Sequence, residues 1–461
     1  MSTSQLGLSG ASRMGDAPVQ LGWTLGELAS DLSGELVGPD ATIARVSTDT
    51  RSDLSDALFV AVRGERFDGN AFAGDAIGRG AVAVLVEVDA NVDVEPRIVV
   101  PDTAEALLGL AAKRRAELTM PVVAITGSTG KTSTKDLIAA GIDGAWASPR
   151  SFNNEVGVPL TVLGTPDDAT ALVLEVGSRG KGHIEWLGKA IAPDVAVVTN
   201  LGVVHLETFG SEEGLADAKY ELIAMLGDEG TAIVPADEPR LRRGTSAREI
   251  TFGEASADVS FGNVNLDSVG RPTFSLVVGD DTYDVSLEVA GSHQALNAAA
   301  ACGAALALDL DLEQFAASMA STSGSDWRMD VHTGRYTVVN DAYNANPQSI
   351  EAALRTVVEM DGNRKIAVLG PMAELGSVCE AEHKRIGALA CELGIDHLLV
   401  VGSDHGYVLG AAPIVANAAG FEEAADTLHA IVEPGDVVLV KASRAAGLER
   451  LAIALVEDSA T

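Results

Sequence analysis

The chain has 461 residues, of which 47% are hydrophobic, and its 32 basic against 66 acidic residues give a formal net charge of −34. A chain of this length exceeds what one hydrophobic core can hold, and predicts about three domains. So negative a charge argues against a nucleic-acid or anionic-membrane partner, because either would need a basic face.

The cysteines bear on disulfide and zinc sites, and the amino terminus bears on the location of the protein in the cell. The three cysteines include no Cys-x-x-Cys pair, so neither a disulfide framework nor a zinc site is predicted. Residues 1–21 lack the basic and apolar regions of a signal peptide, and no apolar run is long enough to cross a bilayer. We therefore expect a soluble cytoplasmic protein without membrane insertion, in which residues 1–21 form a flexible tail.

Residues 22–119 predict a small α/β domain. A helical pattern covers residues 23–36, apolar strands follow at 58–62 and 81–86, and a helix at 102–119 ends before a Met-Pro step. Thr48, Asp49, Thr50 and Arg51 precede the first of these strands. As a strand-end turn they could be purely structural or could contact a ligand.

Residues 122–136, VVAITGSTGKTSTKD, join an apolar strand, a glycine-rich turn and a helical pattern. Glycines let backbone N–H groups curl around phosphate oxygens, and the amino terminus of the helix faces the same anion. A lysine and a threonine follow at the positions that reach the outer phosphates and ligate magnesium. Ile125 stands where the usual P-loop has glycine, which makes this a shorter variant. We interpret the turn as nucleotide-binding rather than incidental, with contacts from Gly127, Ser128, Thr129, Gly130, Lys131, Thr132 and Ser133.

Two α/β domains follow, at residues 120–325 and 326–461. Apolar runs at 171–176, 194–199 and 231–234, separated by helix-length segments, predict a mostly parallel sheet covered on both faces, and alternating runs at 274–278 and 282–289 predict an antiparallel hairpin at its edge. The last domain again alternates strands with helices, as a Rossmann-like fold does, with strands at 336–339, 365–369, 397–401 and 436–440.

Ligands of open α/β sheets bind beyond the carboxyl ends of the strands, where several polar residues stand. Glu175 could complete magnesium coordination begun by Thr132, or could be a solvated strand-end carboxylate. His205 follows the next strand, and a loop histidine is by itself more often a plain hydrogen-bonding residue. Lys219 falls within the apolar face of a predicted helix at 213–226. It either extends to water or is desolvated with a lowered pKa, which would let the neutral amine react with CO₂ to give a carbamate.

Further polar residues lie near the junction of the last two domains. Asn297 follows His293 by four positions in a predicted helix at 292–308, so the two share a face. Arg328 stands at the junction, and the run NDAYNANP at 340–347 caps the first strand of the last domain as a rigid polar turn.

Together these motifs resemble the Mur ligase family. The resemblance covers nearly the whole chain after the tail. Its motifs, in order, are TGSTGKTSTK, SFNNEVGVPLT, EVGSRGKGHI, TNLGVVHLETFGS, AKYE, GSHQALNAAAA, WRMDV, NDAYNANPQS, GPMAELG and KASR. The resemblance implies a UDP-sugar domain, an ATPase domain and a closing carboxyl-terminal domain. It also implies that ATP activates the terminal carboxylate of UDP-MurNAc-tripeptide as an acyl phosphate, which the amine of D-alanyl-D-alanine attacks.

The resemblance also implies roles for individual residues. Lys131 would bind phosphate, Thr132 and Glu175 would hold the magnesium of ATP, and His205 with a carbamylated Lys219 would hold a second Mg²⁺. The implied nucleoside and γ-phosphate contacts are Asn297, Arg328 and Asp341. The implied substrate contacts are Thr48, Asp49, Thr50 and Arg51 for the UDP group, and Tyr343, Asn344 and Asn346 for the peptide or dipeptide. Asn153 and Asn154 are further implied substrate contacts. We expect a monomer.

Some residues depart from the family pattern, and three different functions stay open beside the one that the resemblance implies. Thr50 replaces serine, Pro371 an acidic residue, Ala442 a glycine and Asn70 a histidine. A sister ligase that adds the third peptide residue would carry a D-N-P-R-like motif, where this chain has NDAYNANP. A folylpolyglutamate-type ligase is the second of these functions, and nucleotide binding by a P-loop protein without catalysis is the third.

Overall fold

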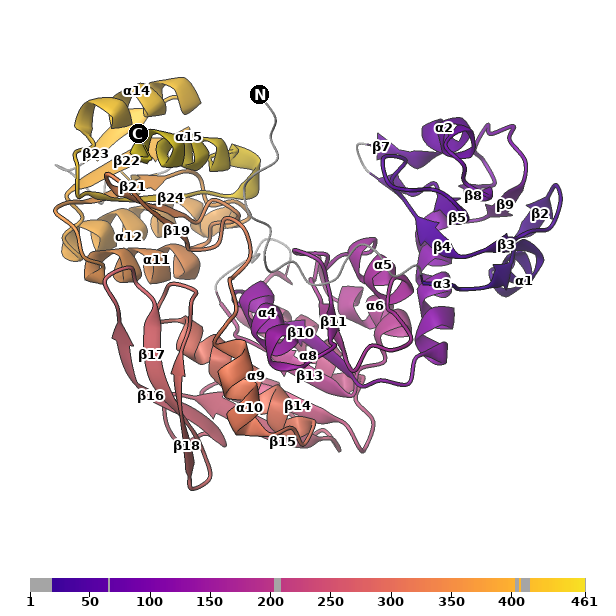
Figure 1. The fold of residues 1–461 in the computed structure, drawn as a ribbon, viewed down its shortest axis with the longest axis horizontal. Coiled ribbons are helices and arrows are strands. Elements are labelled where there is room, and N and C mark those ends of the chain that lie inside the picture. Colours follow the sequence, from indigo (N-terminus) through magenta and orange to yellow (C-terminus); the bar gives the residue numbers. More distant parts are fainter. Residues whose placement is uncertain (1–18, 65–66, 203–208, 403–405, 408–414, 461) are drawn as a thin grey trace.

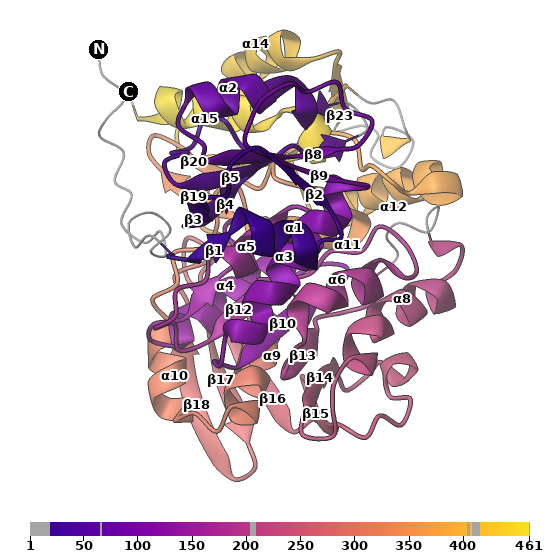
Figure 2. The same ribbon diagram turned by 90° about the vertical axis from the view of Figure 1, so that its right-hand side faces the viewer.

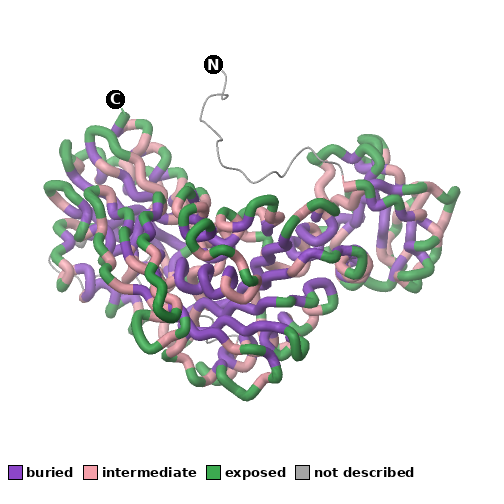
Figure 3. Tube along the Cα trace, turned by 60° about the horizontal axis from the view of Figure 1, so that its bottom comes forward, coloured by how far each residue is buried: buried purple, intermediate pink, exposed green. Residues whose placement is uncertain are grey.

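The computed structural model describes residues 19–64, 67–202, 209–402, 406–407 and 415–460. Three main sheets, each covered by helices on both faces, succeed one another along the chain and define an amino-terminal, a central and a carboxyl-terminal module (Figure 1). The two outer modules rise on either side of the central one (Figure 3). The predicted three-part α/β architecture is therefore confirmed.

The amino-terminal module contains a five-stranded sheet in the order β2-β9-β8-β5-β4. Its strands are β2 (Glu35–Val37), β4 (Arg45–Ser47), β5 (Ala57–Val60), β8 (Ala83–Glu87) and β9 (Arg97–Val100). A short pair, β1 (Trp23–Thr24) and β3 (Thr42–Ile43), and a hairpin, β6 (Arg63–Gly64) and β7 (Phe67–Asp68), flank it, with helices α1 (Leu25–Asp31), α2 (Ala73–Gly78) and α3 (Thr103–Glu117).

Two predictions for this module need correction. The helix predicted at 23–36 ends at Asp31. Ser33 adopts a φ of 53°, which breaks the helix, and the chain continues as a strand. Leu21 is buried and its N–H donates to the carbonyl of Ala44, so it belongs to the folded module and not to the predicted tail. Residues 1–18 of that tail lie outside the described residues.

The central module is built on a nine-stranded sheet in the order β11-β12-β10-β13-β14-β15-β16-β17-β18. Its strands are β11 (Trp146–Ala147), β12 (Leu172–Glu175), β10 (Val122–Thr126), β13 (Val195–Val198), β14 (Thr231–Pro235), β15 (Arg248–Gly253), β16 (Val259–Leu266), β17 (Pro272–Val278) and β18 (Asp281–Ser286). The pairing is parallel as far as β16 and antiparallel from β16 to β18, which confirms the predicted edge hairpin. The sequence prediction omitted β11, β15 and β16.

Apolar side chains on both faces of this sheet explain the helices that cover it. One face packs against α4 (Lys131–Gly141), α9 (Gln294–Ala307) and α10 (Leu312–Met319). The other packs against α5 (Gly157–Leu163), α6 (His183–Ile191) and α8 (Glu212–Ala224). Helix α3 of the amino-terminal module lies against α5 and α6 (Figure 2). One continuous apolar core therefore joins these two modules.

The carboxyl-terminal module has a six-stranded sheet in the order β19-β20-β24-β21-β22-β23. Its strands are β19 (Asp330–Thr333), β20 (Thr337–Asn340), β24 (Val437–Lys441), β21 (Lys365–Leu369), β22 (His397–Val401) and β23 (Val415–Ala418). Helices α11 (Pro347–Glu359) and α12 (Cys379–Glu392) pack on one face, and α14 (Phe421–Ile431) and α15 (Glu449–Ser459) on the other. Its two cores are separate from the core that joins the other modules.

The strand order places the candidate site. β10 lies between β12 and β13, and chain connections leave it in both directions, so a crevice forms beyond the carboxyl ends of these three strands. The carboxyl-terminal module contacts this edge, because the side chain of Gln348 in α11 lies against Gly202. Among the described residues, none of the helices has the length and apolar character needed to cross a membrane.

Candidate active site at the nucleotide loop

The nucleotide loop, residues 127–130, joins β10 to α4. Gly127 and Gly130 have φ values of 141° and 78°, which side-chain-bearing residues rarely adopt. A Cβ atom at Gly127 would lie 2.0 Å from Thr199 Oγ1, and one at Gly130 would lie 2.4 Å from Asn297 Oδ1. Both positions therefore require glycine. Helix α4 begins without a capping side chain, so its first N–H groups are the ones available to an anion.

Lys131 folds back over this loop. Its Nζ donates to the carbonyl oxygens of Gly127 at 2.7 Å and Ser128 at 3.3 Å. Burial lowers the pKa of Lys131, the charge of Glu175 opposes that shift, and Arg328 adds to it. The side chain is thus held at the loop by backbone carbonyls, next to the expected phosphate position.

Thr132 and Glu175 lie in direct contact. Thr132 Oγ1 donates to Glu175 Oε2 at 2.8 Å, and Asn153 Nδ2 donates to Glu175 Oε1 at 2.7 Å. Glu175 is only 1% exposed, and its backbone N–H donates to Ser148 Oγ. A hydroxyl beside a buried carboxylate is the hard oxygen set that Mg²⁺ prefers, so these residues fit the metal. Asn153, predicted as a substrate contact, orients this carboxylate.

Lys219 occupies the buried face of α8, as predicted, together with Leu215, Leu222 and Ile223. Its side chain is 4% exposed. Burial lowers its pKa well below the ordinary value, and the nearby charge of Lys131 lowers it further, while Glu221 opposes the shift. Both effects shift the protonation equilibrium of Lys219 toward the neutral amine. His205, its predicted partner, lies outside the described residues.

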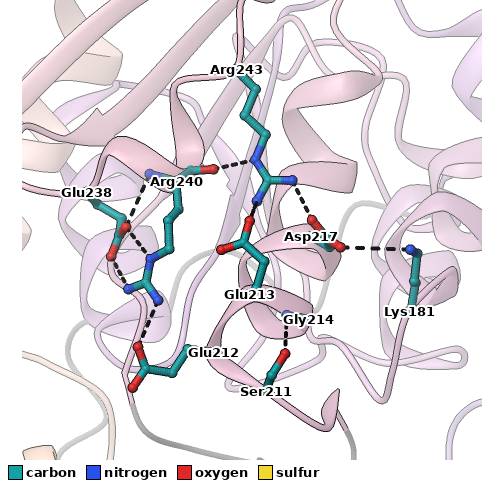
Figure 4. A network of polar contacts seen from close by, with 9 residues as sticks. All are labelled: Lys181, Ser211, Glu212, Glu213, Gly214, Asp217, Glu238, Arg240 and Arg243. Atoms are coloured by element: carbon teal, nitrogen blue, oxygen red, sulfur yellow. Dashed lines mark hydrogen bonds and ion pairs between the residues drawn. The ribbon is translucent and has the colours of Figure 1, made fainter.

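An ion-pair network on the opposite face anchors α8 (Figure 4). Arg243 pairs with Asp217 and, at 3.1 Å, with Glu213. Arg240 pairs with Glu212 at 2.9 Å and with Glu238 at 2.7 Å. These contacts hold the first turns of the helix that carries Lys219.

Arg328 brings the carboxyl-terminal module into the site. Its guanidinium lies 4.1 Å from the ring centroid of Tyr343, and its Nη2 donates to Ser151 Oγ at 3.1 Å. Ser151 Oγ is in turn 3.4 Å from Thr132 Oγ1. Arg328 therefore reaches within one side chain of the candidate metal ligand. Ser151 was missed from the sequence, although it opens the SFNNE motif.

Asp341 is fixed from two sides. Lys441 Nζ donates to Asp341 Oδ2 at 2.5 Å and to the carbonyl of Asn344 at 2.9 Å, and the N–H of Met329 donates to Asp341 Oδ1. Burial lowers the pKa of Lys441, and Asp341 opposes that shift. Lys441 was also missed, although it begins the KASR motif. Within α9, Asn297 Nδ2 donates to Gln294 Oε1 at 2.8 Å.

Several predicted substrate contacts make local hydrogen bonds. Asn154 Oδ1 accepts from the N–H of Gly157 at the start of α5, and Asn346 Oδ1 accepts from the N–H of Ser349 at the start of α11. Asn344 Oδ1 accepts from the N–H of Ala345. These asparagines shape the loops on which they lie, and their substrate roles stay predictions.

The turn at 48–51 lies apart from this cluster, after β4 in the amino-terminal module. Arg51 and Asp49 form an ion pair at 2.7 Å, and the hydrogen bond from Arg51 lowers the pKa of Asp49 to about 2. The side chain of Arg51 is 87% exposed. The pair is thus charged and open to solvent.

The fold and this site define a P-loop nucleotide-binding protein of three modules. Residues 42–116 match the Mur ligase family catalytic domain, residues 125–305 the Mur ligase middle domain and residues 327–444 the Mur ligase glutamate ligase domain. The chain belongs to the Mur ligase family.

Relatives and solved structures agree over nearly the full length. The UDP-N-acetylmuramoyl-tripeptide–D-alanyl-D-alanine ligases of Mycobacterium tuberculosis (strain ATCC 25618 / H37Rv) and Escherichia coli (strain K12) are 37% and 35% identical to the chain. The two alignments cover 95% and 94% of this chain, and 97% and 98% of the relatives. A crystal structure of MurF from Acinetobacter baumannii has a TM-score of 0.87 at 30% identity and covers 96% of this chain and 100% of its own. MurF ligase from Thermotoga maritima in complex with ADP has a TM-score of 0.80 at 28% identity and covers 90% and 97%.

Proposed function

We propose that this chain is the ATP-dependent ligase that joins D-alanyl-D-alanine to UDP-MurNAc-tripeptide. The products are UDP-MurNAc-pentapeptide, ADP and phosphate, in the synthesis of peptidoglycan precursors. The observation that carries this proposal is the likeness to ligases of that name at 37% and 35% identity over at least 94% of each chain. A diaminopimelate-adding ligase shares only 18% identity at a TM-score of 0.52, which supports the fold alone.

The reaction needs activation because a carboxylate is a poor acyl donor. Its oxygen attacks the γ-phosphorus of ATP, the bond to the β–γ bridging oxygen breaks, and ADP leaves. The amine of the dipeptide then adds to the acyl carbon and loses a proton, and phosphate departs with the carbonyl restored. In this assignment Lys131 and Arg328 balance the negative charge of the transferred group, and such charge balance dominates the catalysis of phosphoryl transfer.

Magnesium fits the buried oxygen pair of Thr132 and Glu175, and we assign a second ion to His205 and a carbamylated Lys219. When bound, magnesium supplies charge neutralisation between the phosphates and the attacking carboxylate. The lowered pKa of Lys219 supports the carbamate, because only a neutral amine reacts with CO₂. In this assignment Asn153 orients the buried carboxylate of Glu175 for magnesium binding.

We assign a different role to each of the three modules. We assign the UDP group to residues 22–119 through the turn at 48–51, ATP to residues 120–325, and domain closure to residues 326–461. Asn297 and Asp341 would contact the nucleoside, and the Asn-rich loop with Tyr343 the peptide or dipeptide. We place the reaction in the cytoplasm, where ATP and the UDP-linked precursor meet, and assign it to a monomer.

The decisive experiment measures phosphate release from Mg-ATP by the purified chain with UDP-MurNAc-tripeptide, with and without D-alanyl-D-alanine, while mass spectrometry follows the UDP-linked product. Release that requires both substrates, with a product heavier by one dipeptide, is the expected result. Turnover only with another amine acceptor would favour a sister ligase. No turnover with any acceptor would favour a binding protein.

A further inference from the structure

Asn200 lies directly after β13 and fills the underside of the nucleotide loop. Its Oδ1 accepts from the backbone N–H groups of Ser128 at 3.1 Å and Thr129 at 2.9 Å. Its Nδ2 donates to Thr129 Oγ1 at 2.5 Å. One side chain therefore satisfies three polar groups on two consecutive loop residues.

Two neighbours of Asn200 join the same contact. Thr199 Oγ1 donates to the carbonyl of Thr129 at 2.5 Å, and the N–H of Gly202 donates to Ser128 Oγ at 2.9 Å. The two middle residues of the nucleotide loop, Ser128 and Thr129, are thus bonded to residues 199–202. Gly202 also touches the carboxyl-terminal module, since a Cβ atom there would lie 1.9 Å from Gln348 Oε1.

This arrangement separates two groups of loop N–H donors. Those of Ser128 and Thr129 are bonded to Asn200. Those at the start of α4, after Gly130, carry no capping side chain and present the positive end of the helix. A loop whose shape is fixed before binding loses less conformational entropy when an anion arrives.

We propose that Asn200 is a positioning residue that fixes the nucleotide loop in its phosphate-binding shape. The inference rests on the proposed function, because it takes the loop to bind ATP. Without the side chain, the N–H of Thr129 loses its acceptor and the N–H of Ser128 keeps only the backbone carbonyl of Asn200 at 3.1 Å, so Thr129 and its neighbours become free to sample other conformations. Binding must then order the loop, so nucleotide affinity falls while the sites for the other substrates keep their geometry.

The test measures Mg-ADP binding by calorimetry and steady-state kinetics for Asn200→Ala, Thr129→Val and the double variant. Asn200→Ala should raise the Kd for Mg-ADP and the KM for ATP about tenfold, the effect of one or two lost hydrogen bonds. The KM values for UDP-MurNAc-tripeptide and the dipeptide should not change. Because both single variants break the same bond, the double variant should lose less than the product of the two single effects.

Hydrogen exchange gives a second readout that does not depend on activity. In the ligand-free protein, Asn200→Ala should speed amide exchange in the peptide that contains the nucleotide loop and leave α9 unchanged. Should Asn200→Ala fail to fold, Thr129→Val, which removes only the bond to Nδ2, still tests the link. Asn265→Ala is the matched control, because this exposed asparagine donates only a local bond to the carbonyl of Asn263.

The outcomes separate this inference from the function on which it rests. If the wild-type protein binds no Mg-ADP, the proposed function fails and the inference with it. If the wild-type protein binds Mg-ADP and the Asn200 and Thr129 variants bind it equally well, the inference alone is overturned. A rise of all three KM values by the same factor would also overturn it, because that pattern indicates general loss of structure.

Discussion

Thr132 and Glu175 are 43 residues apart in the sequence, yet Thr132 Oγ1 donates a hydrogen bond of 2.8 Å to Glu175 Oε2. The contact exists because β10 and β12 are parallel neighbours with Ile125 opposite Glu175, so the helix that follows β10 begins beside the end of β12. A strand-end carboxylate with this partner is not an ordinary solvated side chain. The pair is where we assign the magnesium of ATP.

We expect Glu175→Gln to weaken magnesium binding more than it weakens folding. Glutamine keeps an oxygen for Thr132 but removes the negative charge that Mg²⁺ requires. The Mg²⁺ concentration for half-maximal phosphate release should rise at least about tenfold, with maximal turnover lower by about 100-fold or more. Magnesium titration after removal of metal with EDTA measures both. Glu359→Gln, at the exposed end of α11, is the control, and an unaltered magnesium requirement in Glu175→Gln would exclude the assignment.

Lys219→Ala should be nearly inactive and partly rescued by short carboxylic acids. Burial and the nearby Lys131 depress the pKa of Lys219, which favours the neutral amine that forms a carbamate. Acetate or propionate could then occupy the vacated space and replace the carbamate oxygens. Phosphate release across a concentration series of each acid provides the measurement.

Lys181→Ala is the matched control for that series. The side chain of Lys181 is 78% exposed, and its Nζ lies 3.9 Å from Asp217. Asp217 is on the solvent face of α8, the helix that carries Lys219. Lys181→Ala should retain its activity and respond to acetate only as the wild-type protein does. Full activity of Lys219→Ala without any added acid would refute the carbamate role.

The sequence predicted the elements with strong local signals. The buried run at 365–369 and the glycine-rich turn before Lys131 are visible in the amino-acid order, because apolar strands and glycines with positive φ leave a local pattern. The strand Val259–Leu266 was missed, since Gly262 and two asparagines interrupt its alternation. Its place in the sheet comes from its pairing with β17.

The site was also predicted only in part, because only some of its residues stand in a local sequence pattern. Thr132 and Glu175 stand at recognisable positions, one in a motif and one at a strand end. Asn200, Ser151 and Lys441 act through partners that are distant in the sequence, such as Asp341 for Lys441 across 100 residues. Only the strand order brings such pairs together, and no local pattern in one sequence encodes that order.

Arg328→Lys should impair turnover more than nucleotide binding. Lysine keeps the charge but not the flat guanidinium that stacks on Tyr343 while donating to Ser151. We expect kcat to fall about tenfold to 100-fold, with the Kd of Mg-ADP changed by less than about threefold, because the γ-phosphoryl group is absent from ADP. Arg335→Lys is the control, since Arg335 stacks on Tyr336 before the start of β20, whereas the site residue Asp341 follows the end of that strand. A large change in ADP affinity alone would contradict the role assigned to Arg328.

Removal of Arg364 should destabilise the carboxyl-terminal module in a pH-dependent way. The Asp436 side chain is fully buried, and burial raises its pKa. Hydrogen bonds from Arg364 and from the N–H of Glu433 outweigh that effect, so the net pKa is lowered. In the wild-type protein this pair therefore stabilises the fold above the unfolded pKa of about 4, and the contribution disappears as the pH falls through the folded value.

In Arg364→Ala the buried carboxylate has lost its cation, so its folded pKa should rise above the unfolded one and the sign of the dependence reverses. We expect a loss of about 3 kcal/mol at pH 8 that becomes smaller at pH 5, where protonation removes the unpaired charge. Urea unfolding at the two pH values measures this difference. Arg355→Ala, which breaks an exposed pair with Glu351, is the control and should lower the free energy of unfolding by no more than about 0.5 kcal/mol at either pH. If Arg364→Ala loses the same stability at pH 5 and at pH 8, the charge of Asp436 is not the cause.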